Sequence, residues 1–192
     1  MHRLALLSLP AALLFAAPSA RADVWVIPST TKVLPGATSS GVTRVDLVAI
    51  GNEWVGFQVV VAAADQPIPG VDAVASDLVG PVGASIPGTA VDRYREYFVD
   101  LTQHQSSCEV LMNTDCAGHP EYLRAPGWYP DPLIPFTDPY GVEARPVGAP
   151  FDVGAGSLQV VYAELQVPPA IPAGTYEGTF TVTREGGDPV VL

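Results

Sequence analysis

The stretch Thr175-Tyr-Glu-Gly-Thr-Phe-Thr-Val-Thr183 has the pattern of a β-strand with one buried face. Tyr176, Gly178, Phe180 and Val182 alternate there with glutamate and threonine, so one face is largely apolar and the other polar. Successive side chains of a strand point to opposite faces of its sheet, and this alternation is typical of antiparallel sheets with one solvated face. The stretch therefore predicts an antiparallel β protein.

Six further stretches between turn signals resemble strands. They are residues 23–27, 42–50, 53–62, 71–78, 91–101 and 158–167. We predict that the second and third form a hairpin, because Gly51 and Asn52 between them favour a turn. Outside the N-terminal 22 residues no segment has an apolar period of 3.6 residues, and 20 prolines with 18 glycines favour turns over helices. We expect an all-β chain, folded as an antiparallel β-sandwich of the immunoglobulin or jelly-roll kind.

The N-terminus has the features of a cleavable secretory signal peptide. A basic start at His2 and Arg3 precedes an apolar run over residues 4–17, and small residues at Ala20 and Ala22 end the segment. The apolar run is shorter than the roughly 20 residues that a membrane-spanning helix needs. An uncleaved anchor or a lipoprotein is the alternative. We predict cleavage between Ala22 and Asp23 and a secreted product, extracellular or periplasmic.

The size and charge of the remainder limit its possible roles. Loss of Arg3 and Arg21 with the signal peptide would change the net charge from −11 to −13, which argues against nucleic acid and anionic membranes as partners. Residues 23–192 suffice for one sandwich domain, whereas a catalytic (β/α)8 barrel alone takes about 250 residues. The apolar run Pro189–Leu192 looks like a strand in progress, so we expect this sandwich to be the N-terminal part of a longer protein.

The alternating pattern is lost between residues 103 and 150, and both cysteines lie in this stretch. In an exported chain, the pair Cys108 and Cys116 predicts a disulfide that pins the long loop. A zinc site formed by His104, Cys108, Cys116 and His119 is the alternative. An oxidising compartment and the lack of a Cys-x-x-Cys pair favour the disulfide.

Three acidic residues share one face of the predicted strand over residues 91–101. Asp92, Glu96 and Asp100 alternate with Tyr94 and Phe98 on that face, a mixture that could bind a cation or a sugar. Carboxylates four residues apart on a strand are separated by roughly 13 Å, beyond the roughly 5–9.5 Å of glycosidase acid and base pairs. A solvated strand face is the simpler interpretation.

The segment from Ala125 to Phe136 contains four prolines and is the least generic part of the chain. Trp128 and Tyr129 could stack on a ligand, with Asp131 as a polar anchor. Alternatively the segment is a stiff latch that packs over the sandwich or against a neighbouring domain, because prolines preset an extended backbone. We prefer the latch and keep these three residues as candidates for a ligand site or a domain interface.

No constellation of catalytic residues stands out. The serines lack a Gly-x-Ser-x-Gly elbow, no glycine-rich phosphate loop opens a helix, and Asp115, Asp131 and Asp138 lack the spacing of a calcium loop. We expect no cofactor and no catalytic residue in this segment.

Four motifs together resemble the N-terminal β-sandwich domain of glycoside hydrolase family 123 and of related uncharacterised exported proteins. They are Gly51–Val61, Tyr94–Val99, Trp128–Pro135 and Val160–Val182. The most specific part is the Tyr-Pro-Asp-Pro-Leu-Ile-Pro run that starts at Tyr129, followed by the Pro-Ala-Gly-x-Tyr-x-Gly motif that starts at Pro172.

The resemblance implies a role for the chain without implying a catalytic residue in it. In that family the sandwich precedes a (β/α)8-type barrel, and the barrel holds the acidic pair that cleaves N-acetylgalactosaminides. The resemblance thus implies a non-catalytic accessory domain that packs against a downstream catalytic barrel of the same chain. A free-standing secreted carbohydrate-binding or adhesion module, with glycans as its partners, is the alternative.

Overall fold

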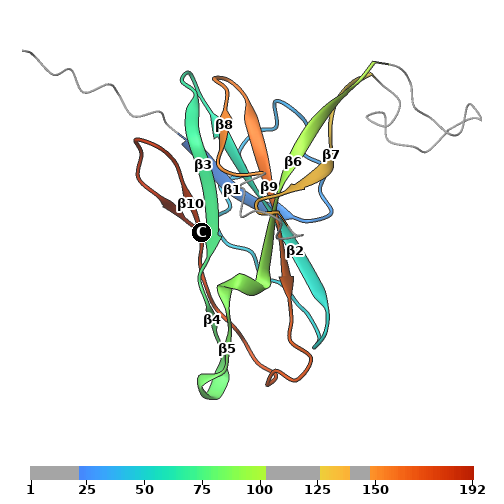
Figure 1. Ribbon diagram of the computed structural model, residues 1–192, viewed down its shortest axis with the longest axis vertical. Coiled ribbons are helices and arrows are strands. Elements are labelled where there is room, and N and C mark those ends of the chain that lie inside the picture. The colour runs from blue at the N-terminus through green and yellow to red at the C-terminus, as the bar shows by residue number, and fades with distance from the viewer. Residues whose placement is uncertain (1–21, 103–125, 139–147) are drawn as a thin grey trace, which may run out of the picture.

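The computed structural model describes residues 22–102, 126–138 and 148–192, which form two antiparallel sheets (Figure 1). The larger sheet has the strand order β1 (Ala22–Pro28), β2 (Trp54–Ala63), β9 (Leu158–Gln166), β6 (Val91–Leu101), β7 (Gly127–Pro135). The smaller sheet has the order β11 (Val190–Val191), β10 (Phe180–Thr183), β3 (Ile68–Ala75), β8 (Phe151–Val153). A short hairpin of β4 (Leu78–Val79) and β5 (Ser85–Ile86) extends from the lower end of the molecule in Figure 1.

The expected all-β class is confirmed. Helical structure in the described part of the chain is limited to two 3-10 turns, Pro81–Gly83 and Gly88–Ala90. Within that part, no helix is long and apolar enough to cross a membrane.

The main core lies between the two sheets. The larger sheet contributes the predicted apolar faces of β2 and β9, among them Phe57, Val59 and Val161. The smaller sheet contributes residues such as Val71 and Phe180, and the Phe57 and Phe180 rings meet edge to face with centroids 5.3 Å apart. Aromatic pairs prefer this geometry. The two sheets therefore form a sandwich, and the face that the alternating pattern assigns to the core lies between the sheets.

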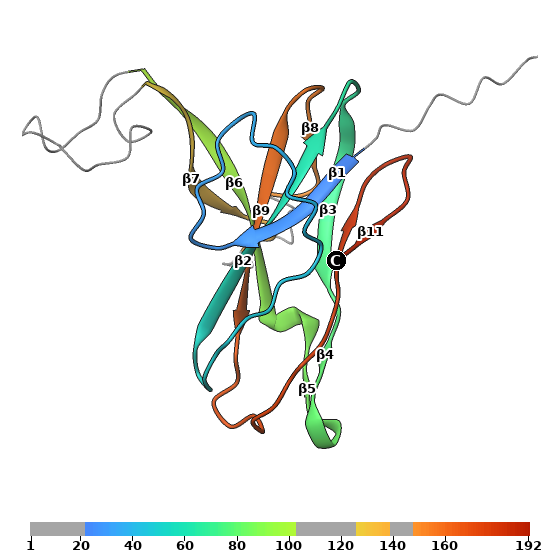
Figure 2. The same cartoon turned by 180° about the vertical axis from the view of Figure 1, so that it is seen from behind.

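A second, smaller core lies on the opposite, outer face of the larger sheet. Its buried members are Trp25, Val33, Val60, Leu158 and Val160. Val33 belongs to the chain between β1 and β2, which loops beside the sheet and then runs to the lower end of the molecule (Figure 2). The outer face is therefore partly covered by this chain, and Phe98 of β6 packs against the same cluster.

The predicted hairpin between residues 42–50 and 53–62 is wrong. Gly51 and Asn52 do form a turn, but residues 42–50 are not a strand. Both edges of β2 are already occupied, because β2 pairs with β1 on one side and with β9 on the other. Residues 42–50 keep one backbone hydrogen bond to the larger sheet, donated by Val26 N to Val42 O at 2.8 Å.

Two other expectations about strands need correction. The proline-rich segment around Trp128 is not an irregular loop, since Gly127–Pro135 forms β7 at the edge of the larger sheet. An edge strand tolerates proline because one row of its N–H groups has no partner strand. The strand predicted over residues 175–183 is shorter than expected. It starts at Phe180, and Glu177 forms only an isolated bridge with Val79.

Candidate functional site

The three residues singled out in the proline-rich segment have different surroundings. Trp128 is 54% exposed and lies opposite Asp100 of β6, whereas Tyr129 is 8% exposed. Asp131 is exposed where the register of the β6–β7 pair shifts. Trp128 and Asp131 are thus accessible to a ligand or a domain, while Tyr129 belongs to the interior. The segment is an edge strand of the larger sheet, and neither the ligand site nor the latch is tested by this placement.

The cysteine and histidine predictions lie outside the described residues. Neither the Cys108–Cys116 disulfide nor the zinc cluster that would add His104 and His119 is tested, and both stay predictions. Among the residues that the structure describes, no group of three His, Cys, Asp or Glu side chains is placed to hold a metal ion.

Glu96 differs from the other two acidic residues on its face of β6. Asp92 and Asp100 are exposed, as a solvated strand face requires, but Glu96 is only 8% exposed. Burial raises the pKa of Glu96 from 4.5 to about 6, and the charge of Lys32 counteracts part of this effect. The interpretation of this face as fully solvated is therefore wrong at its centre. Glu96 lies in register between Leu133 of β7 and Val160 of β9, and Lys32 is near enough to act on its charge. Alternation within β6 cannot predict these neighbours.

Two tyrosines lie beside Glu96 on the same face. Tyr94 of β6 and Tyr162 of β9 are directly opposite in register, with ring centroids 6.5 Å apart and ring planes at 60°. The pKa of Tyr94 is raised by burial, then by the charges of Asp92 and Glu164. Burial and the charge of Glu164 likewise raise the pKa of Tyr162. Tyr162 and Glu164 occupy polar positions of the predicted strand over residues 158–167, but the pattern of that strand alone does not single them out.

A cleft opens between the two sheets at the lower end of the molecule. It encloses about 940 Å³ and reaches core residues of both sheets, including Phe57 and Phe180. The segments that line its sides are residues 43–51 and 171–180. An apolar cleft of this size is within the range of ligand pockets and domain contacts.

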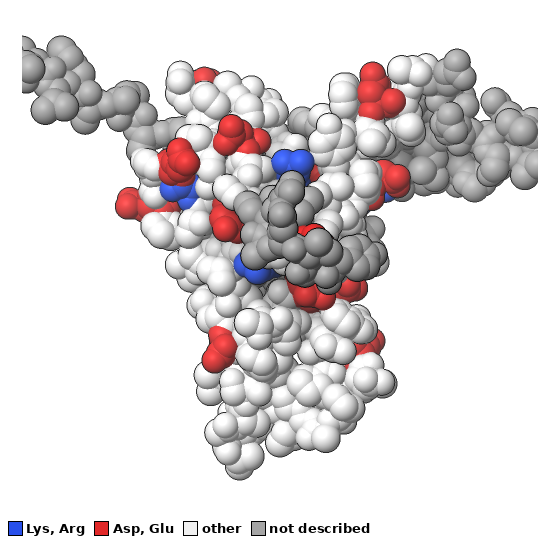
Figure 3. All heavy atoms as spheres, in the orientation of Figure 1, with Lys and Arg blue, Asp and Glu red and all other residues white. Residues whose placement is uncertain are grey.

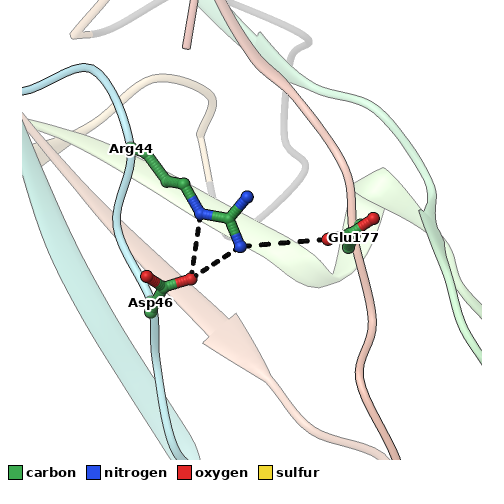
Figure 4. Close-up of polar contacts among 3 residues, drawn as sticks. All are labelled: Arg44, Asp46 and Glu177. Carbon is green, nitrogen blue, oxygen red and sulfur yellow. Dashed lines mark hydrogen bonds and ion pairs between the residues drawn. The ribbon is translucent and has the colours of Figure 1, made fainter.

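A cluster of three charged side chains spans the mouth of the cleft (Figure 4). Arg44 Nη2 donates a hydrogen bond to Asp46 Oδ1 at 2.9 Å. The same Nη2 lies 3.8 Å from Glu177 Oε1 on the other side of the cleft. The hydrogen bond with Asp46 is the main reason that the pKa of Arg44 is raised. All three side chains are well exposed, so this cluster connects the two sides of the cleft only weakly.

The same end of the molecule exposes several large apolar side chains. They are Leu47, Val48, Ile50, Trp54, Val79 and Val82, with Val48 at 94% and Val82 at 95% exposure. The tip of this end carries no charged side chain on the face seen in Figure 3. Large apolar side chains that are exposed at one end of a molecule are candidates for contact with another protein surface.

Comparison with known proteins relates the chain to a glycoside hydrolase at the level of the fold. No protein-family model matches the sequence, and no curated protein matches it. The chain is similar to the solved structure of a family 123 glycoside hydrolase from Clostridium perfringens, described in work on glycolipid glycan hydrolysis. The TM-score is 0.64 at 11% identity over 89% of this chain. The match covers 26% of the enzyme, so this chain spans about a quarter of the enzyme's length.

Proposed function

We propose that this chain is a non-catalytic β-sandwich domain of an exported glycoside-hydrolase-like protein. In this proposal it packs against a downstream catalytic (β/α)8 barrel. The fold match supports the proposal, because nearly all of this chain corresponds to a minor part of a family 123 enzyme. Export rests on the signal peptide, whose cleavage between Ala22 and Asp23 would leave all but the first residue of β1.

The observation that carries the docking role is the apolar lower end of the molecule. Val48, Ile50 and Trp54 are exposed beside an open cleft that reaches the core, and the β4–β5 hairpin adds Val79 and Val82. Covering this end would remove apolar surface from water at about 25 cal/mol per Å². A domain that packs here would also close the gap between residues 43–51 and 171–180.

The cleft itself does not resemble a hydrolase active site. Its two lining carboxylates, Asp46 and Glu177, both face Arg44 at the mouth and have side-chain exposures of 79% and 72%. A glycosidase acid keeps its proton near neutral pH because it is buried away from cations. The cleft is therefore better suited to packing than to hydrolysis.

A free-standing carbohydrate-binding module is the second candidate function. It is favoured by the exposed Trp128 and by the half-buried Tyr94–Tyr162 pair on the outer face of the larger sheet. Aromatic rings on a sheet surface can stack on sugar rings. Measurable glycan binding by a product that ends near residue 192 would favour this candidate over the accessory domain.

The first experiment is the intact mass of the natural secreted product. The accessory-domain proposal expects a polypeptide several hundred residues longer than this chain, whereas a product that ends near residue 192 would refute it. The same mass reports cleavage before Asp23.

A pair of surface substitutions then tests where the domains touch. Val48→Glu with Ile50→Glu should lower the melting temperature of the long protein but leave that of the 192-residue chain unchanged, because both side chains are exposed without a partner domain. Val74→Glu, at a 51% exposed site on β3, is the matched control and should have no effect on either protein. Equal melting of the double variant and the control in the long protein would exclude this end as the interface.

A further inference from the structure

The segment that leads into β10 presents a free backbone edge at the side of the cleft. Adjacent residues of an extended chain direct their N–H and C=O groups to opposite edges. Glu177 exchanges two hydrogen bonds with Val79 of β4, at 2.8 and 3.0 Å, on one edge. Tyr176 and Gly178 therefore direct their backbone groups to the other edge, where none of these groups has a hydrogen-bond partner among the described residues. An unpaired edge of this kind is a template for a further strand.

A strand on this edge is already started by β11. It pairs antiparallel with β10, and Phe180 and Leu192 exchange two backbone hydrogen bonds at 3.0 and 3.1 Å. Phe180 lies two positions after Gly178, so its bonds to Leu192 are on the same edge. In Figure 1 the chain end marked C lies beside the upper end of the stretch that rises from the lower end of the molecule into β10. A chain that kept the direction of β11 would therefore run down the free edge and into the cleft.

The cleft suits the side chains of such a strand. Leu192 lines the cleft, and Val190 and Leu192 pack against the main core. Side chains two positions apart on a strand share a face, so positions 194 and 196 of a continuing strand would face the cleft as well. Val45 and Ile171, one from each side of the cleft, are partly buried apolar residues that would meet them. We therefore expect apolar residues at positions 194 and 196.

The polar contact across the mouth offers little resistance to an added strand. Arg44 Nη2 lies 3.8 Å from Glu177 Oε1, and the two side chains are 70% and 72% exposed. An exposed ion pair at this distance contributes little to stability, and both side chains can stay in solvent without it.

We propose that the polypeptide that follows Leu192 occupies the cleft as a continuation of β11. This inference rests on the proposed function, because it needs the longer protein. It assigns the closing of the gap between residues 43–51 and 171–180 to a strand of the same chain, while the catalytic barrel packs over exposed residues such as Val48 and Val82. The connection to the barrel is then a strand of the sandwich and not a flexible linker.

Disulfide cross-linking in the long protein tests the register of this strand. In the β10–β11 register Thr181 is opposite Val191, which places position 195 opposite Glu177. That pair is not hydrogen-bonded, so its side chains are close enough for a disulfide. Glu177→Cys with position 195 changed to cysteine should cross-link about tenfold more completely than Glu177→Cys with position 194 changed, because a shift of one residue turns the side chain to the other face. The cross-linked peptide is quantified by mass spectrometry after mild oxidation.

The outcomes separate this inference from the proposed function. Equal yields at positions 194 and 195 would refute the strand, because a flexible chain reaches both. A cross-link between two molecules would also refute it and would indicate that a second copy occupies the edge. A product that ends near residue 192 would refute the proposed function together with this inference. A long protein without the cross-link would refute this inference alone.

Hydrogen exchange gives a second measurement that needs no substitution. The amides of Tyr176 and Gly178 should exchange about 100-fold more slowly in the long protein than in the 192-residue chain, because they would gain strand hydrogen bonds. The amide of the exposed Gly186, between β10 and β11, is the control and should exchange equally fast in both proteins. Unchanged exchange at Tyr176 and Gly178 would overturn the proposal.

Discussion

Replacing Glu96 with glutamine should stabilise the protein at neutral pH, because the substitution removes a poorly compensated buried charge and keeps the side-chain size. Burial raises the pKa of Glu96 to about 6 from 4.5 in an exposed carboxyl. Below about pH 4.5 the carboxyl is protonated in both the folded and the unfolded chain. As the pH rises toward 6 the unfolded chain releases this proton first, so the folded chain loses stability over this interval.

The magnitude follows from the size of this difference. One pKa unit corresponds to about 1.4 kcal/mol, so the full cost of the charge at pH 7 would be roughly 2 kcal/mol. Solvent contact at the carboxylate reduces it to about 1–2 kcal/mol. For a domain of this size the gain corresponds to a rise in melting temperature of about 2–8 °C.

The assay is thermal unfolding of the native chain and of Glu96→Gln at pH 4 and at pH 7. The two proteins should melt alike at pH 4, and the variant should melt higher at pH 7. Asp100→Asn, at an exposed site on the same strand, is the control and should show no such difference. A lower melting temperature of the variant than of the native chain at pH 7 would refute the assignment of an uncompensated charge. So would the same difference in melting temperature at both pH values.

Two further predictions concern the framework around the site. Gln58→Met should destabilise the fold by about 2–4 kcal/mol, because the buried Gln58 Nε2 donates to the carbonyls of Pro28, Ser29 and Thr31 and thereby holds the chain after β1. Chemical denaturation measures the loss of unfolding free energy. Gln166→Met at an exposed position is the control and should cost less than about 0.5 kcal/mol. Equal costs for the two variants would mean that Gln58 does not hold the chain after β1. Gly88→Ala should cost about 1–3 kcal/mol, because its Cβ would overlap the carbonyl oxygen of Ala75. Gly154→Ala meets only the Ser157 hydroxyl at 3.1 Å and should be milder, and the reverse order in thermal melts would contradict this packing.

The sequence alone predicted the fold class and the inward faces of the main strands. Strand β6 has the bounds expected from its pattern, and β9 differs from its expected bounds by one residue. The inward positions of β2, such as Val59 and Val61, are buried as their alternation requires. These features depend on near neighbours in the chain, since the two-residue period of a strand is local information.

Strand pairing and the placement of polar residues beside one another depend on the tertiary structure. Residues 42–50 have the composition of a strand but remain unpaired, because β1 and β9 occupy both edges of β2. The proline-rich β7 can form a strand because it lies at a sheet edge, where one row of its N–H groups needs no partner strand. The positions of Asp92 opposite Glu164 and of Glu96 opposite Val160 depend on strands more than 60 residues apart in sequence, as the β6–β9 register shows. Competition among strands for a limited number of edges is a property of the whole sheet, so no local pattern contains it.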